Sequence, residues 1–103
     1  MIIESIVSTV SKRRSVNFAP FGIRKEKKEI IISPYIPSIT LQNLRSNKCA
    51  VVNYIEDASF YVNCILGKKK FKKEKAEKID GFYLKETLSF DEVVVPVSYT
   101  HLR

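Results

Sequence analysis

Three apolar segments separated by short charged turns fill the first third of the chain. The segments are Ile2–Val10, Val16–Arg24 and Glu29–Tyr35, and the turns between them are Lys12–Ser15 and Lys25–Lys28. β-branched and aromatic residues dominate the segments, which predicts strands. Since the turns are too short for a parallel crossover, we expect an antiparallel meander.

Proline and glycine positions refine this prediction. Pro20 and Gly22 are expected to bend or end the regular pairing of the second strand, and Pro34 and Pro37 to stop the third. The uninterrupted run Ile30–Ile32 predicts that the third strand is buried on both faces.

A short helix and two further strands are predicted beyond this meander. Ser38 or Thr40 is a suitable N-cap for a helix that runs to about Asn47, with Leu41 and Leu44 on its inner side. The later segments predicted as strands are Cys49–Ile55 and Thr87–Val97, and the short segment Phe82–Leu84 between them is not assigned.

A second helix is expected to begin after Asp57, which is a good N-cap. Its inner face is predicted to carry the residues that recur at helical spacing, Ala58, Tyr61, Val62 and Ile65. Gly67 stands where a glycine usually ends a helix.

The length of 103 residues indicates one small domain, which a partner subunit would help to stabilise. The chain has no apolar run of roughly 20 residues and no basic signal region, so we expect a soluble cytoplasmic protein without a membrane partner. The segment 96–103 resembles a translated library adapter, and a native and a non-native origin both stay open. The domain is therefore assigned to residues 1–95, and His101, the only histidine, enters no mechanism.

The two cysteines, Cys49 and Cys64, lie in apolar surroundings without the spacing of metal ligands. A structural zinc site needs four ligands, so no metal site is expected. We expect both cysteines to act as small buried hydrophobic residues.

The net charge of +7 is concentrated in one segment. Residues 67–78 hold seven lysines and two glutamates and contribute +5. Such a segment is either a solvated helix or loop, or a surface for nucleic acid or an acidic partner. Phe71 is its only aromatic residue, whereas single-stranded nucleic acids are bound by several stacking rings. We therefore expect the solvated segment.

Two further segments carry the candidate chemistry. Val16–Gly22 resembles a sharply turned strand end, and Ser38–Leu44 starts a helix with hydroxyl groups. Taken separately, these segments would be interpreted as a bulged strand and a capped helix. The backbone N–H groups and hydroxyls of a helix start also suit a phosphate, and no acid–base or nucleophile constellation competes with that interpretation. Together they indicate a phosphorylated ligand.

The order and spacing of three motifs resemble a known superfamily. The motifs are Asn17-Phe18-Ala19-Pro20-Phe21-Gly22, Ser38-x-Thr40-x-x-Asn43-Leu44 and Val51-Val52-Asn53. They resemble the flavin-reductase-like split β-barrel proteins, and within these the domain-of-unknown-function family 447, over about residues 2–66. The resemblance implies a mainly β fold with short helices, an antiparallel six-stranded split barrel, and a homodimer that binds FMN at the subunit interface. Members of that family are longer than this chain, so an amino-terminal fragment is expected.

The resemblance also implies which residues hold the cofactor. The segment from Asn17 to Gly22 would face the flavin, Ser38 and Thr40 would meet the phosphate, and Asn43 would brace that loop or reach the ribityl chain. The implied cofactor-binding residues are Asn17, Ala19, Pro20, Phe21, Gly22, Ser38, Thr40 and Asn43.

One residue departs from the superfamily pattern. A lysine frequently precedes the threonine element, and this chain has Ser38 there. Arg24 or Arg45 is then the candidate replacement for the missing charge. Asn53 is expected to fix a strand end, and Tyr35 to pack in the core.

The sequence thus predicts an FMN-binding split-barrel protein and leaves open whether it is a flavin-dependent oxidoreductase. A non-catalytic flavin carrier and a small basic β-barrel that binds nucleic acid are the alternatives. The sequence identifies neither the small-molecule substrate nor the electron donor.

Overall fold

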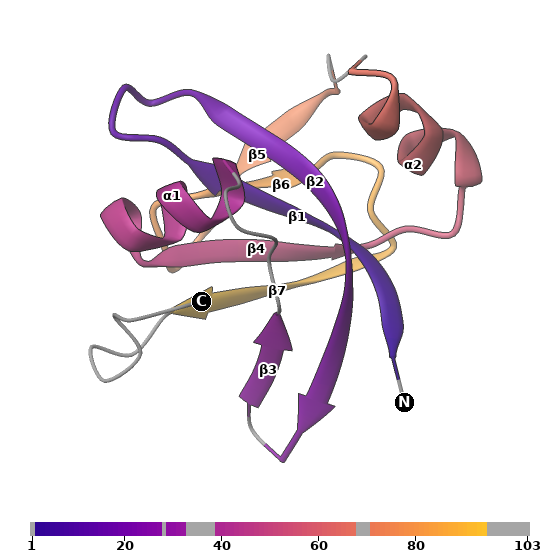
Figure 1. The fold of residues 1–103 in the computed structure, drawn as a ribbon, viewed down its shortest axis with the longest axis horizontal. Coiled ribbons are helices and arrows are strands. Elements are labelled where there is room, and N and C mark those ends of the chain that lie inside the picture. Colours follow the sequence, from indigo (N-terminus) through magenta and orange to yellow (C-terminus); the bar gives the residue numbers. More distant parts are fainter. Residues whose placement is uncertain (1, 28, 33–38, 68–70, 95–103) are drawn as a thin grey trace.

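A computed structural model describes residues 2–27, 29–32, 39–67 and 71–94 (Figure 1). The elements in chain order are β1 (Ile3–Val10), β2 (Val16–Glu26), β3 (Glu29–Ile32), α1 (Ile39–Asn47), β4 (Cys49–Tyr54), α2 (Ala58–Ile65), β5 (Lys73–Lys75), β6 (Phe82–Leu84) and β7 (Ser89–Val94). Five strands form a curled sheet in the order β3-β2-β1-β4-β7, and β5 pairs with β6 in a second sheet. Every pairing is antiparallel. The predicted mainly β fold with two short helices is confirmed.

The first three strands form the predicted meander. Val7 of β1 lies opposite Ala19 of β2 and Val52 of β4. The next position, Ile6, lies opposite Pro20 and Asn53. Because side chains alternate along a strand, these two sets point to opposite faces of the sheet.

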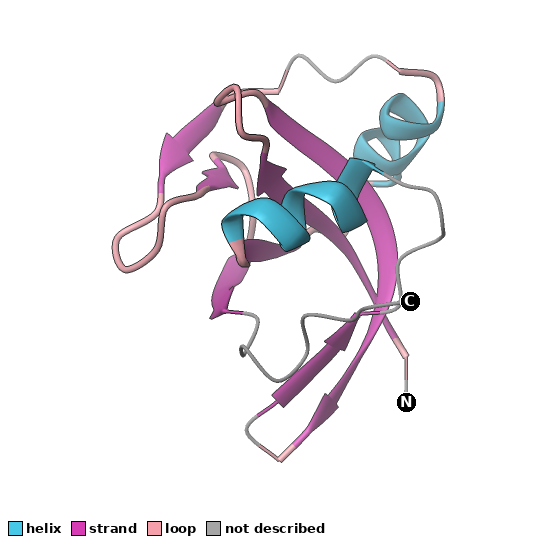
Figure 2. Ribbon diagram, turned by 60° about the vertical axis from the view of Figure 1, so that its left-hand side comes forward, coloured by secondary structure: helices cyan, strands magenta, loops and turns pink. Residues whose placement is uncertain are grey.

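α1 lies against one face of the sheet, and α2 lies against the other together with the β5–β6 hairpin. The two helices are well apart in both views (Figures 1 and 2). On the face covered by α1, here the α1 face, the buried cluster consists of Val7, Phe21, Ile23, Leu44, Ala50 and Val52. On the opposite face, here the α2 face, it consists of Ile6, Phe18, Ile55, Cys64 and Leu84. Since both faces are packed, six consecutive residues of β1 are buried.

Two details of the predicted meander are wrong. β3 is the edge strand of its sheet, so its isoleucines are only partly buried. β2 continues to Glu26, because Lys25 and Glu26 still pair with Ile30 and Glu29. Of the two alternatives for Pro20 and Gly22, the structure agrees with a bend: the pairing of β1 with β2 runs unbroken from Ile3 to Val10, and β2 curves across the sheet (Figure 1).

α1 begins at Ile39, so Thr40 lies inside the helix and is not its cap. Leu41 and Leu44 are buried, as predicted. The predictions for Ser38, Tyr35 and the segment 96–103 fall outside the described residues.

The second helix has the predicted caps but a different buried face. The Asp57 carboxylate accepts the Ser59 N–H at 2.9 Å, and Gly67 has a φ of +78° just beyond the helix end. The predicted inner face is wrong, because Val62 and Ile65 are 50% and 77% exposed. The helix instead packs through three residues, Phe60, Tyr61 and Cys64. The Tyr61 phenol donates to the Ile55 carbonyl at 2.9 Å, which fixes the rotation of the helix.

In the described part of the lysine-rich segment the lysines are exposed, as predicted, but residues 73–75 form a strand rather than a helix or loop. Lys73, Glu74 and Lys75 form β5 and pair with β6. Cys49 and Cys64 are buried, as predicted. In the described part of the chain no helix is long and apolar enough to cross a membrane, and no group of three or more potential ligands gathers around a metal position.

Asn53 connects β4 to β1 and β6, which confirms its predicted role at a strand end. Its side chain is fully buried. The amide nitrogen donates to the Ile6 carbonyl at 2.8 Å and to Ser8 Oγ at 3.2 Å, and the amide oxygen accepts the Leu84 N–H at 2.8 Å. Asn53 therefore satisfies backbone groups of two neighbouring strands that no water can reach.

We expect Asn53→Ala to lower the free energy of unfolding by about 1–3 kcal/mol, since it leaves the buried Leu84 N–H without a partner. Urea denaturation followed by circular dichroism measures the change. The control is Asn63→Ala on α2, for which we expect a change within about 0.5 kcal/mol. Equal losses in the two variants would contradict this role of Asn53.

Asp80 fastens the β5–β6 connection to the rest of the molecule. Its carboxylate binds both Nη atoms of Arg14 at 2.5 and 2.6 Å and Lys75 Nζ at 3.1 Å. Its carbonyl accepts from Asn47 Nδ2 at 3.0 Å and from Cys49 Sγ at 3.4 Å. The hydrogen bonds from Arg14 and Lys75 hold the pKa of Asp80 well below its usual range.

Because the folded-state pKa of Asp80 is depressed, its contribution to stability is present above the unfolded pKa of about 3.9 and is lost as the pH falls below it. We therefore expect Asp80→Asn to lower the melting temperature at pH 7, by an amount that shrinks below about pH 4. Scanning calorimetry at several pH values measures the difference. Glu86→Gln, at an exposed acid after β6, is the control. A difference between wild type and Asp80→Asn that is the same at pH 3 and pH 7 would refute this linkage.

Candidate cofactor site

Four polar side chains from β1, β2 and α1 gather on the α1 face. Asn17 Nδ2 donates to Thr40 Oγ1 at 3.5 Å, and Asn43 Nδ2 donates to Thr9 Oγ1 at 2.9 Å. Thr9 lies directly opposite Asn17 in the pairing of β1 with β2. Thr9, Thr40 and Asn43 are buried, whereas Asn17 is only partly buried. Asn17 is thus the member of this polar cluster that a ligand reaches most directly.

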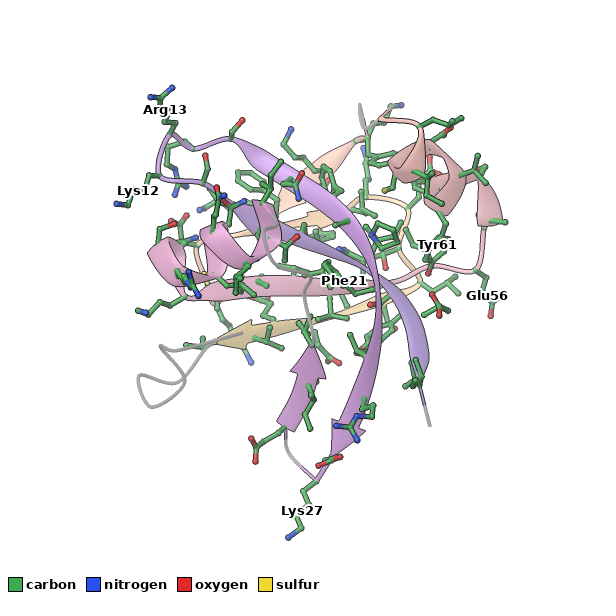
Figure 3. All side chains as sticks on the ribbon, viewed as in Figure 1. Lys12, Arg13, Phe21, Lys27, Glu56 and Tyr61 are labelled. Carbon is green, nitrogen blue, oxygen red and sulfur yellow. The ribbon has the colours of Figure 1, made fainter. Side chains whose placement is uncertain are left out.

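Strand alternation decides which predicted residues join this cluster. Asn17, Ala19 and Phe21 occupy every second position of β2, and Ala19 and Phe21 pack in the apolar cluster of the α1 face. They therefore share a face with Thr40 and Asn43 of α1. Phe21 points into the interior beneath β2 (Figure 3) and is 9% exposed, so it supports the site from within the core.

Pro20 and Gly22 occupy the intervening positions and belong to the α2 face. The structure does not bring these two residues to the polar cluster on the α1 face. Gly22 has a packing reason, because a Cβ atom there would lie 2.6 Å from Cγ2 of Ile2. Ser38 directly precedes α1 but lies outside the described residues.

The polar cluster consists of neutral donors and acceptors. No acidic residue lies in the first turn of α1, and the four clustered side chains are amides and hydroxyls. The amino-terminal end of a helix carries partial positive charge and unpaired N–H groups. Such a donor set fits phosphate and sugar oxygens, and it lacks the carboxylates that would repel them.

Neither arginine that the sequence suggested as a phosphate partner lies at the start of α1. Arg24 pairs with Ile31 on the α2 side of the sheet and forms an ion pair with Glu26 at 3.3 Å. Arg45 lies in the last turn of α1, about 9 Å along the helix from Ile39.

Sequence reasoning missed two features of the α1 face. The first is Thr9, for which the sequence predicts a strand but no role in the site. Its place opposite Asn17 follows only from the pairing of β1 with β2. The second feature is a group of three residues from different strands, in which the Tyr54 phenol donates to Asp91 Oδ2 at 2.7 Å and Lys25 Nζ lies 3.3 Å from the same oxygen.

The Lys25 ammonium also lies 4.5 Å from the centroid of the Tyr54 ring. Burial, followed by the hydrogen bond to Asp91, raises the pKa of Tyr54. The phenol therefore stays protonated at neutral pH and acts as a hydrogen-bond donor. This group connects side chains of β2, β4 and β7 on the α1 face.

Comparison with solved structures shows that several known proteins share this fold. The 2-nitrobenzoate 2-nitroreductase of Pseudomonas fluorescens matches with a TM-score of 0.77 and 18% identity over 86% of this chain and 51% of that chain. Flavoredoxin of Desulfovibrio vulgaris (Miyazaki F) matches with a TM-score of 0.74 and 13% identity over 90% of this chain and 59% of that one. At these identities the likeness shows the fold alone.

An FMN-bound protein from Methanosarcina mazei, itself assigned to DUF447, is similar at 27% identity. Its TM-score is 0.69, and the match covers 86% of this chain and 48% of that protein. The chain thus spans about half the length of these structures. The expected split-barrel fold is confirmed.

The comparison with curated proteins gives no match. The family model described as protein of unknown function (DUF447), N-terminal domain, matches residues 3–101. The chain therefore belongs to the DUF447 family, as an example of its N-terminal domain.

Proposed function

We propose that this chain binds FMN on its α1 face and forms the flavin-binding part of an oxidoreductase. The observation that carries the proposal is the polar cluster of Thr9, Asn17, Thr40 and Asn43, together with partly buried apolar side chains on the same face, which include Ala19 and Ile32. A phosphorylated sugar needs polar groups of the first kind and a flat ring system needs apolar contacts of the second. The FMN-bound Methanosarcina protein, a member of the same family, supports this assignment.

The residues of the polar cluster have distinct tasks in this proposal. Asn17 and Thr40 would hold phosphate or ribityl oxygens together with the first N–H groups of α1. Asn43 would support the polar cluster from the buried interior, because its side-chain amide donates to Thr9 Oγ1 there. Ala19, a small and partly buried residue on the same face, would leave room for the ring.

Bound FMN supplies hydride and electron transfer, and the polypeptide holds it and sets its surroundings. The described polar groups of the α1 face are mostly neutral amides and hydroxyls, which suits a protein that binds the cofactor and leaves the chemistry to it. A flavin carrier would use the same site, so the proposal of turnover rests on the fold shared with a nitroreductase.

We expect Asn17→Ala to weaken FMN binding about tenfold, because it removes one hydrogen bond to an oxygen of a charged ligand. Quenching of FMN fluorescence during titration with the protein measures the dissociation constant. Asn63→Ala is the matched amide control on α2, and we expect its affinity to stay within about twofold of wild type. Wild-type protein that fails to quench FMN would refute the proposal, and equal affinity of wild type and Asn17→Ala would remove Asn17 from the site.

We also propose that the chain forms a homodimer that covers the flavin. Several half-buried apolar side chains continue the α1-face core to the surface, and they are Ile3, Ile30, Ile32 and Val93. β3 also leaves one edge of the five-stranded sheet without a neighbouring strand among the described residues. A second copy would bury these side chains and add the stability that a small domain lacks.

Native mass spectrometry of freshly purified protein is expected to show two chains with two FMN molecules. Ile32→Lys places a charge in the proposed interface and is expected to shift the protein to monomer. Ile65→Lys, the same change at a 77% exposed position of α2, is the control and should leave the dimer intact. Monomeric wild-type protein with FMN bound would refute the dimer and leave the flavin site standing.

A further inference from the structure

A concave surface lies on the α2 face, away from the polar cluster. It is a solvent-open cavity of about 540 Å³ between the β1–β2 turn, the start of β2 and the segment 71–73. Arg14 and Ser15 contribute from the turn, Val16 and Phe18 from β2, and Phe71 with two lysines from the last segment. Pockets for small ligands typically measure about 300–1,000 Å³, so this cavity has the volume for one.

The cavity and the polar cluster lie on opposite sides of the same strand. Val16 and Phe18 point to the α2 face, where both pack with the cluster around Leu84. Asn17, the residue between them, points to the α1 face and reaches Thr40. A ligand in the cavity would therefore occupy a site separate from that of FMN.

Aromatic rings form the apolar floor of the cavity. The rings of Phe18 and Phe71 meet edge to face with centroids 5.4 Å apart, and Phe60 stacks on Phe71 at 5.1 Å. Phe18 is 2% exposed, whereas Phe71 is only partly buried. Aromatic pairs of this kind are favourable, so they hold the Phe71 ring in place. Part of this ring remains exposed for contact with a ligand.

The rim of the cavity is positively charged. Arg14, Lys72 and Lys73 line it, and none of the described lining residues is acidic. The Arg14 guanidinium is held by both oxygens of Asp80, which fixes its position and offsets its charge. The two lysines, both exposed, are therefore the charge partners that remain for an anion.

We propose that this cavity binds a small organic anion that carries a flat aromatic ring, of the mononucleotide class. The ring would pack on Phe71, and the phosphate would meet Lys72 and Lys73. Proteins bind single-stranded nucleic acid without reading its sequence by stacking bases on aromatic side chains and by placing cationic groups at the phosphates, and one nucleotide would use the same two contacts. The cavity offers one such partly exposed ring among its lining residues, so it fits one nucleotide better than a polymer.

The test is a titration of 15N-labelled protein with adenosine 5′-monophosphate, with and without saturating FMN. We expect amide shifts at residues 14–18 and 71–73 that do not depend on FMN. Inorganic phosphate and adenosine are titrated separately, and each should bind at least tenfold more weakly than the nucleotide. Shifts confined to the α1 face, or shifts that FMN abolishes, would overturn the separate site.

Matched charge reversals identify the groups that bind. We expect Lys72→Glu to weaken nucleotide binding about tenfold. Lys27→Glu makes the same change of charge at the distant β2–β3 turn (Figure 3) and should stay within about twofold. Phe71→Ala should weaken binding of the nucleotide but not of phosphate, and Lys72→Glu decides between the outcomes if that variant fails to fold.

If Lys72→Glu and Lys27→Glu lowered the affinity for the nucleotide equally, the nucleotide would be attracted only by the net charge of the protein. That result would overturn the proposal. A single-stranded oligonucleotide that binds far more tightly than the mononucleotide would replace it with a nucleic-acid surface. We expect Asn17→Ala to weaken FMN binding but to leave nucleotide binding unchanged. Failure of the nucleotide proposal and failure of the FMN proposal therefore give different results.

Discussion

The register of β1 between β2 and β4 is the constraint on which the rest of the structure depends. β1 is buried on both sides, and its side chains alternate between two separate apolar clusters. A shift of β2 by one residue against β1 would exchange the two faces of β2. It would turn Asn17 away from Thr40 and would bring Phe18, which belongs under α2, against α1. The polar cluster and the cavity both exist because this register holds.

Buried polar groups on both faces of the sheet also stabilise this register. The side-chain amide of Asn53 lies in the interior of the α2 face. Its hydrogen bonds to Ile6 and Leu84 form only if β1, β4 and β6 all keep their positions. Asn43 does the same on the other face through Thr9. Buried polar groups that lose their partners are costly, so each amide disfavours slipped pairings more strongly than an apolar residue would.

Local signals in the sequence were sufficient for much of the fold. The charged turns predicted the meander, Asp57 predicted a helix start, and the spacing of Asn17, Thr40 and Asn43 predicted residues that the structure brings to one face. These predictions depend on neighbours in the chain or on a motif with fixed spacing.

The features that the sequence did not predict depend on contacts between distant segments. α2 could have buried Val62 and Ile65, but the hydrogen bond from Tyr61 to Ile55 and the packing of Phe60 and Cys64 turn these two outward. The edge position of β3 follows from the strand order. Thr9 became visible only through its partner across the sheet.

The two faces of β2 suit anions by different physical means. Around Asn17 the donors are neutral and partly buried, so they select a ligand by the geometry of its oxygens, and salt screens them little. Around Phe71 the charges are exposed lysines, which attract many anions and lose strength as salt increases. A tightly held cofactor belongs on the first surface and an exchanging ligand on the second. One strand of eleven residues can serve both, because its alternation keeps the two surfaces apart.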